Sequence, residues 1–229
     1  MAKSKLIKDF INSNMDLDIA LQNLLVILND LDNDELTNWA RKELTGYSLE
    51  DKLPKYRQIN GCVMANFIIG CVQYSSLPFP IHHLDNKLQE KLKNVPLYLS
   101  ISAFINNIKE GEGLNKLITP EYYPLLQSNT NANITNAYSH IDVTSITGIV
   151  STVKTKVLDT LLFLEKEFGN LDDLEIDIST KTPKERDAII QKIYINLYDN
   201  SISIGNGNKI KDSNIISNDV GDNNEWDNV

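Results

Sequence analysis

The chain has 229 residues, 41% of them hydrophobic and 23% charged, which excludes a wholly disordered chain and suits one large domain or one domain with an accessory segment. Its formal net charge of -9 at pH 7 produces a field that repels phosphate groups, so we expect no broad nucleic-acid surface. The apolar runs are much shorter than the roughly 20 residues that cross a bilayer, and we therefore expect a cytoplasmic protein.

The first residues predict a short helix with a basic face. Lys3, Lys5 and Lys8 alternate with apolar residues at helical spacing as far as Ile11. We interpret this pattern as a surface helix with solvated lysines, and contact with an anionic membrane or a phosphate group is the alternative.

Two further helices are predicted next. Apolar residues recur every three or four positions from Leu17 to Leu28, which predicts an amphipathic helix over residues 17–31. Asp32 and Glu35 have the spacing of a capping box and predict the start of another helix. Gly46 occupies the position of a left-handed C-terminal cap, where that helix would end.

The middle of the chain is rich in β-branched and aromatic residues. Residues 55–61 and 63–74 could form strands or helices, because short apolar runs do not distinguish the two. Residues 76–81 contain two prolines and predict an extended connector. Cys62 and Cys71 lack the spacing of a zinc site or a disulfide framework, and their apolar neighbours predict buried free thiols.

The second half contains the strongest helix signal. Residues 137–144 alternate enough to predict a strand, and apolar residues from Ile149 to Phe168 then predict a long helix near 146–168 that ends at Gly169. Thr182, Pro183 and Glu185 form an N-terminal capping pattern for a last helix. The predicted fold class is therefore mainly α with minor β: a helical N-terminal body with a few short strands, followed by a β-prone C-terminal tail.

The C-terminal tail has an unusual composition. Isolated isoleucines lie in an Asn-, Gly- and Ser-rich background and cannot bury enough apolar surface within one chain to offset the entropy of ordering. Stacking between subunits would bury them, so we expect a homo-oligomer, with a disordered or loosely docked tail as the alternative. The candidate oligomerisation residues are Ile202, Ile204, Ile210 and Ile215. Residues 170–198 form a connector and helix, and residues 199–229 form the tail.

Known catalytic and metal-binding patterns are missing from the sequence. Glycine-rich phosphate loops and the GxSxG nucleophile pattern do not occur. His82 and His83 are adjacent and would point in different directions, and His140 has no histidine at metal-ligand spacing. We therefore predict no cofactor and no metal, and the catalytic residues stay unknown.

Arginine occurs at only three positions, and two of them lie in an aromatic-rich part of the chain. Arginine presents a planar fork that suits a carboxylate or a pair of carbonyl groups. We expect Arg57 to be anchored in a structural network, with contact to a ligand or a partner as the alternative. The candidate structural or partner site consists of Trp39, Arg41, Glu43, Tyr47, Tyr56 and Arg57.

Several of these residues form spaced elements that resemble the AbiTii family of bacterial abortive-infection proteins. The elements are Trp39 with Glu43-Leu44, Gly46 and Tyr47, then Pro54-Lys-Tyr56-Arg57, and a proline-containing connector. Residues 146–165 also resemble the last helix of that family, although Lys154 and Lys156 stand where many relatives would have arginine. The resemblance covers residues 6–168 and implies an AbiTii-like helical domain over residues 1–169.

The resemblance implies a role in phage defence, in which infection leads to arrest or death of the host cell. It brings no agreed active site. The leading hypothesis is a non-enzymatic effector or scaffold that self-assembles through its tail and binds a phage or defence-system protein. A toxin enzyme, either a nuclease or a nucleotide-consuming enzyme with a site around Arg41, Tyr56 and Arg57, is the first alternative. A membrane-disrupting effector that uses residues 3–11 is the second.

Overall fold

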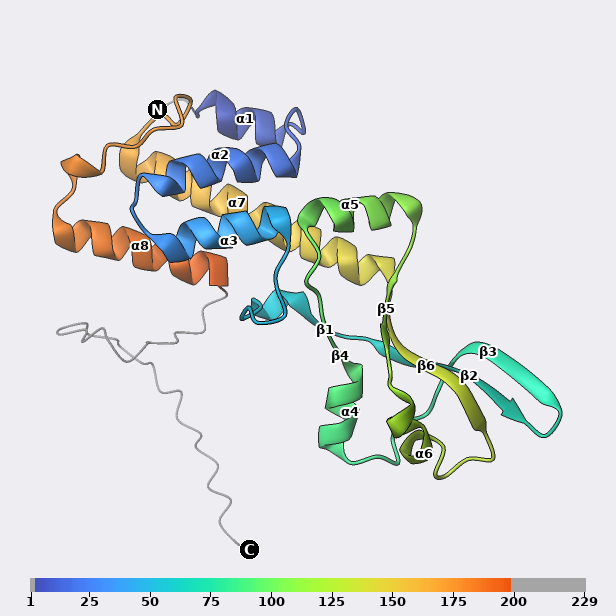
Figure 1. The fold of residues 1–229 in the computed structure, drawn as a ribbon. Helices are drawn as coiled ribbons and strands as arrows, with labels where there is room; N and C mark the ends of the chain where they lie inside the picture. The colour runs from blue at the N-terminus through green and yellow to red at the C-terminus, as the bar shows by residue number, and fades with distance from the viewer. Residues whose placement is uncertain (1–2, 199–229) are drawn as a thin grey trace, which may run out of the picture.

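A computed structural model describes residues 3–198 of the chain (Figure 1). The fold is 54% helix and 17% strand, which confirms the predicted class, mainly α with minor β. The α-helices are α1 (Lys5–Ile11), α2 (Leu17–Asn29), α3 (Asp34–Thr45), α4 (Asn86–Lys93), α5 (Ile101–Glu110), α6 (Tyr123–Leu126), α7 (Val143–Phe168) and α8 (Pro183–Tyr198). The strands are β1 (Gln58–Asn60), β2 (Cys62–Ile69), β3 (Val72–Pro78), β4 (Asn94–Pro96), β5 (Leu114–Leu117) and β6 (Asn133–Ile141). Short 3₁₀ turns lie at η1 (Lys55–Arg57), η2 (Pro120–Tyr122) and η3 (Ile178–Thr180).

Helix α7 forms the spine of the molecule. It contacts α1, α2, α5, α8 and η1, and it runs past all of them in Figure 1. Its apolar stripe, which includes the fully buried Val153, Val157 and Leu161, fills the centre of the helical body. Because a helix of 26 residues is about 39 Å long, one element can reach both ends of this body.

A smaller lobe is built on a four-stranded antiparallel sheet. The strand order is β3-β2-β6-β5. The lobe has its own core, in which Val63, Ala65 and Ala137 from one face of the sheet pack with Leu92 of α4 and Leu126 of α6. A two-stranded ribbon, β1 with β4, lies between this lobe and the helical body (Figure 1). The ambiguous residues 55–61 and 63–74 therefore form the η1 turn, β1, most of β2 and the start of β3, because tertiary pairing decides what local composition leaves open.

Several predicted helix ends are confirmed. Helix α2 covers Leu17–Asn29, close to the predicted range. Thr182 and Glu185 exchange bonds at the start of α8: the Thr182 backbone N–H donates to Glu185 Oε2 at 2.8 Å, and the Glu185 N–H donates to Thr182 Oγ1 at 3.4 Å. Helix α7 ends before Gly169, whose φ of +94° favours glycine.

Two predicted boundaries are wrong, the start of helix α3 and the end of strand β6. The N-cap of α3 is Asn33, whose side chain accepts a bond from the Leu36 N–H, while Asp32 adopts a positive φ of 49° one residue earlier. Asn33 and Asp32 are both good caps, and the chain uses the later one. Strand β6 ends at Ile141, because Asp142 caps α7 and draws the predicted strand residues Val143 and Thr144 into the helix.

The prediction of buried thiols is also wrong. Cys62 and Cys71 are both exposed. Cys62 begins β2 on the sheet face opposite Val63, and Cys71 lies in the turn between β2 and β3. Apolar neighbours in sequence do not bury a strand residue, because alternate residues point to opposite faces of the sheet.

The candidate tail residues Ile202, Ile204, Ile210 and Ile215 lie outside the described residues. Within residues 3–198, no helix combines the length and the apolar character needed to span a bilayer.

Candidate functional site

Five of the six candidate residues meet at the junction of the helical body and the sheet lobe. Trp39 and Glu43 lie one turn apart on α3, Tyr47 follows that helix, and Tyr56 and Arg57 belong to η1. Because residues i and i+4 share one face of a helix, α3 presents the indole and the carboxylate to the same neighbour. We call Trp39, Glu43, Tyr47, Tyr56 and Arg57 the junction network.

The centre of the junction network is a buried ion pair. Arg57 Nε donates to Glu43 Oε1 at 3.0 Å, and Arg57 Nη2 donates to Glu43 Oε2 at 2.6 Å. Both side chains are 0% exposed. Such a paired fork is the geometry for which arginine is preferred over lysine, and it compensates the desolvation of both charges.

Two tyrosines complete the shell around the carboxylate. The hydroxyl groups of Tyr47 and Tyr56 each donate to Glu43 Oε1 at 2.7 Å. Trp39 Nε1 donates in turn to the Tyr56 hydroxyl at 2.9 Å. Burial, reinforced by the negative charge of Glu43, raises the pKa of both tyrosines well above 10.0, so both phenols stay protonated as donors.

The remaining donors of Arg57 fasten the loop that leads from the β1–β4 ribbon into α5. Arg57 Nη1 donates to the carbonyl oxygens of Leu97 at 3.1 Å and Leu99 at 2.6 Å, which lie between β4 and α5. The guanidinium lies over the ring of Tyr47 at 4.6 Å and that of Phe104 at 5.1 Å. One side chain therefore ties together α3, η1, the β4–α5 loop and α5.

Gly46 allows the end of α3 to approach the backbone of the β4–α5 loop closely. Its φ is +92°, and a Cβ atom there would lie 2.9 Å from the carbonyl oxygen of Tyr98. The next residue, Tyr47, donates its backbone N–H to that same oxygen at 2.8 Å. A side chain at residue 46 would therefore push apart the two segments that carry the network.

Lys156 extends the network to the last helix, and sequence reasoning missed this role. Its ammonium group lies 5.4 Å from the centre of the Tyr56 ring and donates to the backbone oxygen of Asn196 at 2.5 Å. The Asn196 side chain returns a bond to the Lys156 carbonyl at 3.1 Å. The signal in the sequence was a lysine three residues after Val153, on the apolar face of α7, where a charge needs buried partners.

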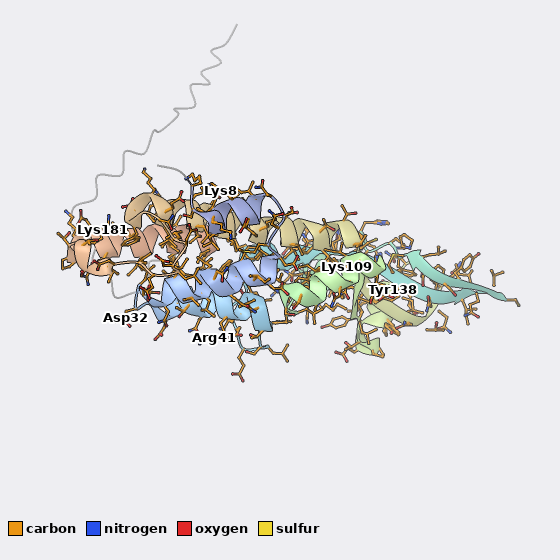
Figure 2. All side chains as sticks on the ribbon, turned by 90° about the horizontal axis from the view of Figure 1, so that it is seen from above. Lys8, Asp32, Arg41, Lys109, Tyr138 and Lys181 are labelled. Atoms are coloured by element: carbon orange, nitrogen blue, oxygen red, sulfur yellow. The ribbon has the colours of Figure 1, made fainter. Side chains whose placement is uncertain are left out.

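Arg41 is the candidate residue that does not join. It is exposed on α3, and Figure 2 places its label at the outer surface of the helical body. Arg41 lies two residues from both Trp39 and Glu43, and such a spacing turns a side chain to another side of a helix. Arg41, Tyr56 and Arg57 therefore do not form one site.

The charged groups of the junction network have their hydrogen-bonding capacity filled by partners within the protein, and this determines what the network can do. Glu43 accepts bonds from four donor atoms, and Arg57 donates through Nε, Nη1 and Nη2. Both groups are sealed from solvent, and each is fully occupied by bonds within the protein. The arrangement suits a rigid joint and offers no exposed nucleophile or base.

A pocket lies beside the network, between α7 and α8. It has a volume of about 330 Å³. The hydroxyl groups of Thr152 and Thr155 donate to carbonyl oxygens of their own helix, at 2.9 and 3.0 Å, so they face the pocket mainly as acceptors. The lining residues are Ser151, Thr152, Thr155, Lys156, Asp159 and Asn196. In the part of the chain that the structure describes, no group of three or more His, Cys, Asp or Glu side chains could hold a metal ion.

Comparison with known proteins gives one positive result. A family model described as AbiTii matches residues 4–192, which is most of the chain and includes the whole junction network. No curated protein and no solved structure matches the chain.

Proposed function

Because the chain belongs to the AbiTii family, which points to abortive infection as a defence against phage, we propose that it is a defence effector or scaffold that acts by assembly and partner binding. In this proposal the helical body is a rigid platform in the cytoplasm. The platform presents its surfaces to further copies of the chain and to a phage or defence-system protein.

The observation that carries the proposal is the junction network. The family-like residues Trp39, Glu43, Tyr47, Tyr56 and Arg57 bond to one another and to backbone carbonyls, not to a cleft. Their arrangement supports a role in holding α3, η1 and the β4–α5 loop in a fixed orientation, at the place where the β1–β4 ribbon joins the helical body. A fixed orientation is what a binding platform needs, because it lowers the entropic cost of association.

The two alternatives receive less support from the geometry. A toxin site around Arg41, Tyr56 and Arg57 would need these side chains together and accessible, whereas Arg57 is sealed and Arg41 lies apart. A membrane role for residues 3–11 would need an exposed apolar face. Leu6, Ile7 and Phe10 of α1 are instead buried in the helical core.

The experiment is a phage challenge of cells that produce the full-length protein. We expect infected cultures to stop growing and plaque numbers to fall. A variant with serine at positions 202, 204, 210 and 215 should lose protection while its circular dichroism spectrum stays native. Arg41→Ala is the matched control and should protect like the wild type. If the four-serine variant protects cells fully, assembly through the tail is not needed for defence. If purified protein degrades RNA or DNA or consumes nucleotides, the enzymatic alternative is favoured.

A further inference from the structure

The hairpin of β2 and β3 extends from the sheet lobe, and β3 is the edge strand of the sheet. Both views show this hairpin as the part of the molecule farthest from the helical body (Figures 1 and 2). Strand β3 pairs with β2 on one side, and no strand within residues 3–198 pairs with its other side. Its outer backbone groups are therefore available for a further strand.

Strand β3 contributes no buried side chain to the lobe. Six of its seven residues are exposed and one is half-buried, whereas a strand covering a core normally buries every second residue. Val72 is 53% exposed, and Leu77 is 42% exposed. The hairpin is nevertheless well formed, because the rings of Phe67 and Tyr74 stack across its strands at 5.1 Å and Phe67 meets Phe79 edge-on at 5.3 Å.

The charge pattern of this region is unusual. Residues 58–84 contain no Asp, Glu, Lys or Arg, although these four types make up 23% of the chain. Soluble proteins commonly guard a free edge strand with charged side chains, especially lysine. The opposite edge, β5, carries Lys116, whose ammonium group donates to the Asn94 carbonyl at 2.7 Å. Strand β3 has no charged side chain that would discourage pairing with another strand.

Part of β3 is closed to pairing. The strand is irregular near Ser76, where φ is +52° and the backbone N–H donates to Asn66 Oδ1 at 2.6 Å. Pro78 also lacks an N–H to donate. The regular stretch from Val72 to Ser75 is therefore the part of the edge that suits a new strand.

From these observations we propose that β3 pairs edge to edge with β3 of a second copy of this chain. A chain of net charge -9 repels its own copies, and a charge-free hairpin far from the body is the place where two copies meet with the least repulsion. A positively charged partner would find no negative side chain to pair with at this neutral edge. An antiparallel pair of identical strands is also self-complementary about a two-fold axis.

This inference rests on the proposed function, because it names a surface for the assembly proposed there. It does not involve the tail isoleucines. The two-fold pair would be a dimer of twice the 25.9 kDa chain mass, and contacts of the tail could then join dimers into larger species.

The test is the association of purified full-length protein, measured by sedimentation equilibrium over a range of concentrations. Val72→Lys combined with Ser75→Lys, both exposed positions of the regular stretch, should raise the dimer dissociation constant at least about tenfold, since each added charge occurs twice at a two-fold interface. Leu117→Lys on β5 is the matched control, because Leu117 is 70% exposed on the opposite edge of the same sheet. That control should leave the constant unchanged.

Amide hydrogen exchange identifies the surface independently. Residues 72–75 should be protected in concentrated wild-type protein and should lose protection on dilution or in the double-lysine variant. A wild-type monomer at all concentrations would overturn the inference, and so would a dimer that the two lysines leave intact.

Two results separate this inference from the proposed function. If the four-serine tail variant is monomeric and the double-lysine variant assembles normally, β3 pairing is wrong while assembly-based defence stands. If the double-lysine variant is monomeric but still protects cells against phage, β3 pairing stands and assembly is not the basis of defence. If the wild-type protein stays monomeric and residues 72–75 become protected from hydrogen exchange only when a purified phage protein is added, then β3 binds that protein. This result would overturn the self-pairing.

Discussion

Arg57 and Glu43 form two hydrogen bonds, of 3.0 and 2.6 Å, at a point where neither side chain reaches solvent. Transfer of two charges into such a place costs free energy that the pair, its tyrosine shell and the Leu97 and Leu99 carbonyls must offset together. The pair is therefore strongly sensitive to the loss of one member.

Arg57→Ala is expected to lower the free energy of unfolding by about 3–5 kcal/mol, because it leaves the Glu43 carboxylate buried and without its counter-charge. Urea denaturation followed by tryptophan fluorescence measures the change. Arg41→Ala removes an exposed arginine from the same region and should stay within about 0.5 kcal/mol of the wild type. Equal losses for the two variants would contradict the structural role of the ion pair.

The two tyrosines should differ in their contributions. Tyr47→Phe removes one bond to Glu43 and should cost about 1 kcal/mol. Tyr56→Phe removes a similar bond and also leaves Trp39 Nε1 without its acceptor, so it should cost about 1–3 kcal/mol more. Parallel thermal and urea unfolding of the two variants compares them, and an equal cost would mean that the Trp39 bond adds nothing.

Stability should fall in alkaline solution. Burial raises the pKa of Tyr47, Tyr56 and Tyr198 in the folded protein above the ordinary 10.0. The unfolded chain then releases these protons at lower pH than the folded protein does, so the contribution of each group is complete below pH 10.0 and declines above it. The expected slope is about 1.4 kcal/mol per pH unit for each of the two well-buried tyrosines, Tyr47 and Tyr56, and is smaller for the partly exposed Tyr198. Denaturation at several pH values measures this slope, which Tyr47→Phe should make shallower.

Part of the junction network could be predicted from the sequence. The i, i+4 spacing of Trp39 and Glu43 places them on one face of α3, and scarce arginine marked Arg57 as an anchored residue. The carbonyl groups of Leu97 and Leu99 could not be foreseen, because every residue has a carbonyl and only the tertiary fold brings these two to Arg57.

The wrong predictions have a similar cause. The exposure of Cys62 depends on which face of the sheet α4 and α6 cover, and no local pattern specifies that choice. The choice of Asn33 over Asp32 as the cap of α3 depends on the turn that enters the helix, since both residue types cap well. Long periodic elements such as α7 depend mainly on their own residues and were predicted closely.

Lys156→Met should loosen α8 without unfolding the body. Methionine keeps most of the apolar stem but loses the bond to the Asn196 carbonyl and the charge at the C-terminal end of α8. Hydrogen exchange should become faster across Pro183–Tyr198, while exchange in α2 stays slow. Lys154→Met, which removes an exposed lysine two residues away on the same helix, is the control and should leave α8 unchanged.

Two glycine substitutions should have opposite signs. Gly148 lies exposed within α7, and a Cβ atom there would meet nothing within 4 Å, so Gly148→Ala should stabilise the protein by about 0.5–1 kcal/mol through helix propensity alone. At Gly113 a Cβ atom would lie 2.4 Å from the Ile141 carbonyl oxygen, so Gly113→Ala should destabilise the sheet lobe. Thermal unfolding compares both variants with the wild type. If Gly148→Ala raises the melting temperature but abolishes protection in the phage challenge, the bare surface of α7 at Gly148 is required for contact with a partner, since the substitution leaves every internal contact in place.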